Sequence, residues 1–144
     1  EMCIRDRYYI KCIMKNNIFK LTEHVYYLSL LVLLILYLFP GSLIGYLLYG
    51  NLGQQPNLIS NPIGTSINHL IFFSYITILA TTVRLRVKNI LTSYRFILFI
   101  SCVLEISHLI IPNRAFELYD LIANFTGVVI ILLLNSFIKW RKHL

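Results

Sequence analysis

Residues 119–138 read YDLIANFTGVVIILLLNSFI, an apolar run of 20 residues in which Asp120 is the one charged side chain. A helix of roughly 20 predominantly apolar residues is long enough to cross the hydrocarbon core of a bilayer. The basic residues Lys139, Arg141 and Lys142 follow the run directly. The stretch is therefore typical of a transmembrane helix that ends at a basic membrane surface.

Three further apolar runs precede this one, and they cover residues 25–49, 67–83 and 96–112. Pro40 and Gly41 interrupt the first run, and a proline inside a helix removes a backbone hydrogen bond. The first helix is therefore predicted to end near Phe39, which leaves residues 42–49 as an interfacial or re-entrant segment. The second and third runs are close to the shortest length that spans a bilayer.

The composition of the whole chain indicates a bilayer environment. Hydrophobic residues make up 58% of the 144 residues and charged residues 13%, whereas a soluble domain carries roughly 25% charged residues. The mean hydropathy is +0.72. A soluble protein of this size has too little interior to bury so much apolar surface. The sequence therefore predicts one domain of the all-α class, an integral membrane bundle of about four transmembrane helices in contact with the lipid bilayer.

The positive charge of the chain lies between the apolar runs. The net charge is +7, but the basic residues form no amphipathic stripe, which argues against a nucleic-acid partner. Loops rich in Lys and Arg stay in the cytoplasm. If four helices alternate, ten basic residues fall on one side: Lys11, Lys15, Lys20, Arg84, Arg86, Lys88, Arg95, Lys139, Arg141 and Lys142. Both termini are therefore predicted to be cytoplasmic, with Arg114 on the outer side.

The N-terminal segment has an interpretation of its own. Residues 1–7 read EMCIRDR, which resembles the translated remnant of a sequencing-library adapter. We interpret residues 1–13 as this remnant and a leader, Met14 as the expected natural start, and residues 14–144 as the transmembrane domain. A signal peptide is the alternative for the basic lead and the apolar run. The run from Val25 is too long for one, and no small-residue cleavage site closes it, so a retained helix is predicted.

Ionisable residues in or beside a membrane span are costly and commonly functional. The alternating topology places six polar residues near the outer face, and they are His69, Glu105, His108, Arg114, Asp120 and Asn124. Glu105 and His108 share a helix face. The same holds for Asp120, Asn124 and Gly127 in the fourth span. We expect the polar stripes of the third and fourth spans to face each other, and Gly127 to let a neighbouring helix approach closely.

Each of these residues also has a structural interpretation. Glu105 is suited to a buried pair with Arg114 or His108, because intramembrane charges serve structure as well as function. Asp120 is suited to capping the fourth helix, and Asn124 to hydrogen bonding between helices. The histidines and carboxylates are ligand types that zinc accepts, but their spacing fits no metal motif. No metal site and no cofactor are therefore predicted.

Two stretches on either side of the last loop carry a recognisable pattern. Residues 104–114 read LEISHLIIPNR and residues 120–127 read DLIANFTG. Together they resemble the VanZ-like family of small bacterial membrane proteins. The family pattern is Glu, two residues and Gln, then a Pro-x-Arg loop, then Asp, three residues, Asn, two residues and Gly. The chain matches each of these positions except the Gln, which is His108 here.

The resemblance extends to most of residues 25–140. The family carries a histidine at the start of the second helix, often after Asp-Lys. His69 matches this histidine, while Ile67 and Asn68 stand in place of the acidic and basic pair. The turn at residues 39–42, FPGS, is also similar. The departures at Asn68 and His108 bear more on shared chemistry than on a shared fold.

The resemblance implies a role at the cell envelope. The family is named for a protein that gives low-level resistance to teicoplanin, a lipoglycopeptide that acts at the outer face of the membrane, and most members have no established activity. The first hypothesis is a protein that acts on or binds an envelope lipid or glycopeptide at the outer leaflet. Glu105, Arg114 and Asp120 would form its charged network, with His69 and His108 as hydrogen-bonding or proton-transfer partners.

Two alternatives remain open. One is a non-enzymatic scaffold or accessory subunit that packs with a membrane protein partner through small-residue and polar faces. The other is a membrane-embedded hydrolase or transferase that uses the carboxylate–histidine cluster. The sequence does not decide whether the protein is an enzyme. A transporter fits less well, because four short helices offer little room for alternating access.

Overall fold

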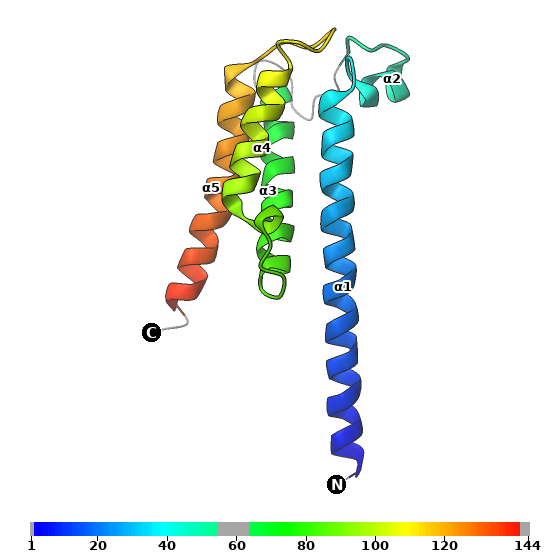
Figure 1. Ribbon diagram of the computed structural model, residues 1–144, viewed down its shortest axis with the longest axis vertical. Helices are drawn as coiled ribbons and strands as arrows, with labels where there is room; N and C mark the ends of the chain where they lie inside the picture. Colours follow the sequence, from blue (N-terminus) through cyan, green and yellow to red (C-terminus); the bar gives the residue numbers. More distant parts are fainter. Residues whose placement is uncertain (1, 55–63, 142–144) are drawn as a thin grey trace.

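The computed structural model describes residues 2–54 and 64–141, and that part of the chain is all-α (Figure 1). Its elements are α1 (Met2–Leu38), α2 (Leu43–Tyr49), α3 (Gly64–Arg84), the short 3₁₀ helix η1 (Ile90–Thr92), α4 (Tyr94–Ser107) and α5 (Leu118–Arg141). The all-α class predicted from the apolar runs is confirmed.

Three helices are long and apolar enough to cross a membrane, and they are Asn16–Leu38, Ser66–Arg84 and Leu118–Arg141. The fourth apolar run is helical over 14 residues in α4, which gives a length of about 21 Å. This helix ends at Ser107 and does not continue to Pro112 as the apolar run predicts. Backbone hydrogen bonds continue as turns as far as Ile111, whose N–H donates to the Ser107 carbonyl at 3.1 Å. The described part of the chain therefore has three candidate membrane spans, and α4, which covers the remaining apolar run, is shorter than any of them.

The break after the first span lies where the sequence predicts it. α1 ends at Leu38, and Gly41 adopts a positive φ of 85° that turns the chain away from the helix axis. The Ser42 hydroxyl then caps α2 by accepting the Gly45 N–H at 2.9 Å. The apolar side chains of α2 are exposed, with Leu47 at 73%. A short helix with exposed apolar side chains is what an interfacial segment requires.

Close packing between α3 and α5 organises the bundle. These two helices make the most extensive contact of any pair, and α1 packs beside α3. A Cβ atom added at Gly127 would lie only 2.6 Å from the Leu70 carbonyl oxygen. The prediction that Gly127 lets a neighbouring helix approach closely is therefore confirmed, and the neighbour is α3. The core includes Phe73, Ile76 and Val128, all with exposures of 0%.

The helices alternate in direction. α1 and α4 run one way along the bundle, and α3 and α5 run the other way (Figure 1). This arrangement gathers the α3–α4 connection and the C-terminal end of α5 at one end of the molecule. Arg86 in that connection donates to the Asn16 side chain at 2.7 Å and lies over the Phe19 ring at 4.3 Å. The segment before the first span and the connection between α3 and α4, which were predicted to lie on the same side, are therefore in direct contact. The loop after α4 lies at the opposite end of the bundle, together with α2 (Figure 1).

Candidate functional site

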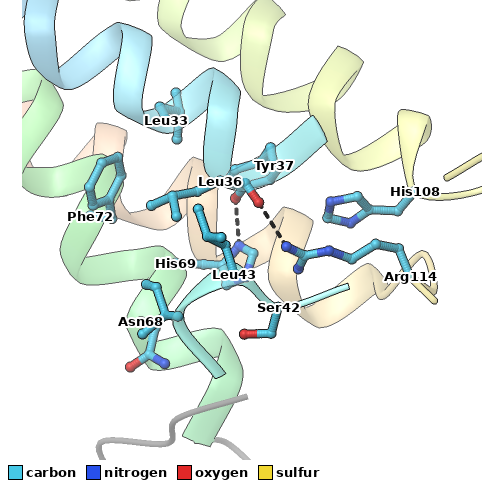
Figure 2. A pocket seen from close by; sticks show the side chains of 11 residues that line it. Leu33, Leu36, Tyr37, Ser42, Leu43, Asn68, His69, Phe72, His108 and Arg114 are labelled. Atoms are coloured by element: carbon cyan, nitrogen blue, oxygen red, sulfur yellow. Dashed lines mark hydrogen bonds between the residues drawn. The ribbon is translucent and has the colours of Figure 1, made fainter. Parts of the chain in front are cut away.

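A tyrosine in the last turn of α1 forms the centre of the polar cluster. The Tyr37 hydroxyl lies 2.6 Å from Nδ1 of His69 on α3, and the Tyr37 side chain is buried (Figure 2). Its oxygen is also 3.5 Å from Oδ1 of Asn124 on α5. Tyr37 is not among the site residues predicted from the sequence, yet its hydroxyl joins residues of three helices.

The second nitrogen of His69 points to a carboxylate. Nε2 lies 3.4 Å from Oδ2 of Asp120, and the other Asp120 oxygen accepts the Ser66 hydroxyl at 2.6 Å. The tautomer with the imidazole hydrogen on Nε2 lets the Tyr37 hydroxyl donate to Nδ1 and directs an N–H toward Asp120, and the proposed mechanism uses this tautomer. A chain from Asp120 through His69 to Tyr37 results, and each member comes from a different helix.

The short bond to His69 also decides the role of Asn124. A hydroxyl has one hydrogen, and the 2.6 Å contact takes it in preference to the 3.5 Å contact. The Asn124 side chain is fully buried, and its Nδ2 lacks a hydrogen-bond partner among the described residues. The amide oxygen and nitrogen are assigned from their surroundings. Exchanging them lets Asn124 donate to the Tyr37 oxygen, and the amide oxygen then takes the position that has no partner among the described residues.

A second carboxylate–histidine pair lies on the other side of Tyr37. Nδ1 of His108 is 3.4 Å from Oε1 of Glu105, one helical turn before it on α4. The same Glu105 oxygen accepts the backbone N–H of Glu117 at 3.2 Å, next to the start of α5. The His108 ring stacks on the Tyr37 ring, with centroids 5.3 Å apart and planes 14° apart. Tyr37 is therefore flanked by two histidines, each paired with a buried carboxylate.

Arg114 joins the loop after α4 to the end of α1. Its Nη2 donates to the Leu36 carbonyl at 2.7 Å, which is one of the carbonyls that the end of a helix leaves without a partner (Figure 2). Burial lowers the pKa of the Arg114 guanidinium, while the neighbouring Tyr37 and Glu105 side chains act to raise it. An arginine retains its charge despite such a shift.

The charged residues are not joined in the way the sequence analysis expected. A single network of Glu105, Arg114 and Asp120 was predicted, but the two contacts within 4 Å between a basic side chain and a carboxylate among the described residues both involve a histidine, which is charged only when protonated. On α5, Asp120 contacts His69 and Ser66 of α3, and Asn124 contacts Tyr37 of α1. The close contact at Gly127 turns α5 toward α3, so Asp120 meets His69 first.

A cavity of about 150 Å³ opens beside this cluster. It is lined by Leu33, Leu36, Tyr37, Ser42, Leu43, Ile44, Asn68, His69, Phe72, His108 and Arg114 (Figure 2). Two buried atoms of the lining residues have no hydrogen-bond partner among the described residues, and they are Nε2 of His108 and Nε of Arg114. A buried polar atom without a partner is costly, and a bound ligand or water would relieve that cost. The cavity thus combines an apolar wall with polar groups suited to a ligand.

The chemistry that this geometry supports is proton transfer. A carboxylate that orients an imidazole, which in turn contacts a hydroxyl, is the arrangement that activates a hydroxyl group in acyl-transfer enzymes. Asp120, His69 and Tyr37 have these three roles by position. The described part of the chain contains no group of three His, Cys, Asp or Glu side chains that could hold a metal ion.

Comparison of the chain with protein-family models, curated proteins and solved structures gives no significant match. The function must therefore be argued from the site itself.

Proposed function

We propose that the chain is a VanZ-like multi-pass protein of the bacterial cytoplasmic membrane that binds and acts on an envelope component at the outer leaflet. The observation that carries the proposal is the Tyr37 hydroxyl, which is bonded to His69 beside a cavity and flanked by two carboxylate–histidine pairs. A structural polar cluster needs hydrogen bonds alone, whereas this one places a carboxylate, an imidazole and a hydroxyl in series beside a cavity.

The proposed mechanism is acid–base catalysis at the cavity. His69 accepts the Tyr37 proton, or through Tyr37 the proton of a hydroxyl or amine of the ligand, and Asp120 stabilises the imidazolium that results. Arg114 supplies a fixed positive charge at the cavity wall for an anionic group. The ligand class is a lipid-linked or glycopeptide molecule whose polar head reaches this depth.

The outward position of the site rests on a four-crossing topology, which also belongs to the proposal. The alternating helix directions support it, as does the shared end of the basic segments. α4 and the turns that follow it to Ile111 serve as the fourth crossing, with the bilayer adapting to its short length. Both termini are then cytoplasmic.

Cysteine labelling in whole cells tests this orientation. Cys3, Cys12 and Cys102 are first replaced by serine, and one new cysteine is then introduced as Gly53→Cys or Asn89→Cys. We expect a membrane-impermeant maleimide to label position 53 in intact cells and position 89 only after permeabilisation. The opposite pattern would place the cavity at the inner face and remove the envelope role.

Teicoplanin susceptibility tests the function. The protein is expressed in a sensitive bacterium as wild type, Tyr37→Phe and Tyr75→Phe, at equal membrane levels. Tyr37→Phe keeps the ring that stacks on His108 and removes the hydroxyl that bonds His69. Tyr75→Phe is the matched control, because its hydroxyl contacts Ser29 at 3.1 Å outside the site.

We expect wild type and Tyr75→Phe to protect and Tyr37→Phe to give no protection. Equal protection by all three would show that the Tyr37 hydroxyl has no role in resistance. If none protects, teicoplanin is not the relevant compound, and turnover of lipid-linked precursors by purified protein becomes the test of the same site.

A further inference from the structure

The end of the bundle opposite the Tyr37 site carries two grooves lined by cations. One groove, of about 500 Å³, lies between the end of α3, the start of α4 and the end of α5, and includes Arg84, Lys88 and Lys139. The second, of about 590 Å³, shares Arg84 and Lys88 with the first and adds Arg95. Four positive side chains therefore line the two grooves, and two of them, Arg84 and Lys88, are common to both.

These cations have no acidic neighbour in the grooves. Neither groove is lined by Asp or Glu, and both ion pairs in the described residues involve histidines at the other end of the bundle. Asn135 also lines the first groove, and its Nδ2 is buried without a hydrogen-bond partner among the described residues. Cations and an unsatisfied amide donor in one groove form a set of donors that only an anion or a similar acceptor complements.

The walls of the grooves continue onto apolar surface. Leu132 on α5 lines the first groove, and Phe96 and Phe99 on α4 line the second. Phe99 is 64% exposed. Both α3 and α5 are candidate membrane spans, so Leu132 on α5 is placed to meet acyl chains, while Arg84 and Lys139 lie at the ends of these spans, where a helix reaches the headgroup region. Tyr94, at the start of α4, adds an aromatic ring suited to the interface.

We infer that this end of the bundle binds the headgroup of an anionic phospholipid. The phosphate lies among Arg84, Lys88 and Lys139, with Asn135 as a further donor, and the acyl chains follow the apolar walls. A soluble anion would use the cations but not the apolar walls. Attraction of a juxtamembrane cation to an anionic surface is worth about a fivefold change in affinity for each Lys or Arg. The inference does not depend on the Tyr37 site.

Native mass spectrometry of the full chain in detergent tests this site. The protein is mixed with phosphatidylglycerol or with phosphatidylethanolamine of the same chain length, and inorganic phosphate is added as a competitor. Two double variants are compared, Arg84→Gln/Lys139→Gln in the groove and Lys20→Gln/Arg141→Gln outside it. Each pair removes one Arg and one Lys from exposed positions on the basic side.

We expect wild type to retain phosphatidylglycerol in preference to phosphatidylethanolamine. The groove variant should bind it about 25-fold more weakly, and the control variant should bind it as wild type does. Equal retention of both lipids, or an equal loss in both variants, would overturn the inference, since either result describes general surface attraction. Full displacement by inorganic phosphate would also overturn it, because the ligand would then be a soluble anion. Circular dichroism confirms that the variants remain folded, and Lys139→Glu alone provides a second groove variant.

Discussion

The substitution Gly127→Ala tests the contact that organises the whole site. An alanine Cβ at this position would lie 2.6 Å from the Leu70 carbonyl oxygen and 3.1 Å from the Ser74 backbone nitrogen. Both atoms belong to the backbone of α3, so no side-chain rotation relieves the contact. Going from 2.6 Å to 3.0 Å, the shortest distance that real Cβ atoms adopt, requires α3 and α5 to separate by about 0.4 Å.

The expected cost follows from overpacking. Inserting a methyl group into a close contact costs about 1–3 kcal/mol in the free energy of unfolding. The separation also reaches the site, because Asp120 lies two turns before Gly127 on the same face of α5. The nitrogen–oxygen distance between His69 and Asp120 is already 3.4 Å, so a few tenths of an ångström weaken it further. Loss of stability and loss of function should therefore occur together.

Unfolding in mixed micelles measures the effect. The helical signal in circular dichroism is followed as the fraction of sodium dodecyl sulfate rises, for wild type, Gly127→Ala and Gly53→Ala. Gly53 is the matched control, because a Cβ there would meet only the Asn51 side chain at 3.5 Å, an ordinary contact. A Gly127→Ala protein within about 0.5 kcal/mol of wild type, the usual range of neutral substitutions, would refute the close α3–α5 packing.

Two further predictions concern the buried carboxylates. Ser66→Ala removes the donor to Asp120 at 2.6 Å and should lower the free energy of unfolding by about 1–3 kcal/mol in the same micelle titration, with Ser66→Thr restoring it. Glu105→Ala should lower stability because the Glu117 N–H loses its acceptor, whereas Glu105→Gln keeps an acceptor and should retain most of that stability. Both Glu105 variants should lose protection against teicoplanin, because His108 loses its carboxylate. Equal stability of Glu105→Ala and Glu105→Gln would contradict the hydrogen bond from the Glu117 N–H to Glu105.

The apolar runs predicted where helices lie but not all of their bounds, because α1 begins at Met2, well before the run that starts at residue 25. The end of the first helix was predictable because Pro40 lacks the N–H that a continuing helix needs and Gly41 readily adopts a positive φ. The end of α4 was not. Residues 109–111 are apolar and continue the run, yet Leu109 and Ile110 are 70% and 86% exposed in turns beyond the helix. An apolar run shows which residues are compatible with the hydrocarbon core of a bilayer, but it does not show at which residue the helical hydrogen bonds end.

The members of the site were more predictable than their pairing. Placing His69, His108 and Asp120 at one depth follows from alternating helices alone. Which of them meet depends on the rotation of each helix about its axis, and the close contact at Gly127 constrains this rotation for α3 and α5. Tyr37 was missed because a tyrosine near the end of an apolar run also fits an aromatic belt. The available signal was its place one turn before Pro40, at the same end of the bundle as His69.

The two histidines have different surroundings, and the difference assigns their roles in the proposed mechanism. His69 has a partner on each nitrogen, Tyr37 on one and Asp120 on the other, so it can only move a proton between groups that are already in place. His108 uses Nδ1 toward Glu105 and keeps Nε2 without a partner while it lines the cavity. A ligand in the cavity would therefore meet His108 directly and would reach His69 through Tyr37.

In the VanZ-like pattern the position of His108 is a Gln, which can bind a ligand but cannot exchange a proton near neutral pH. In the proposed mechanism Tyr37 and His69 therefore carry the proton, and His108 sets which ligand this chain accepts.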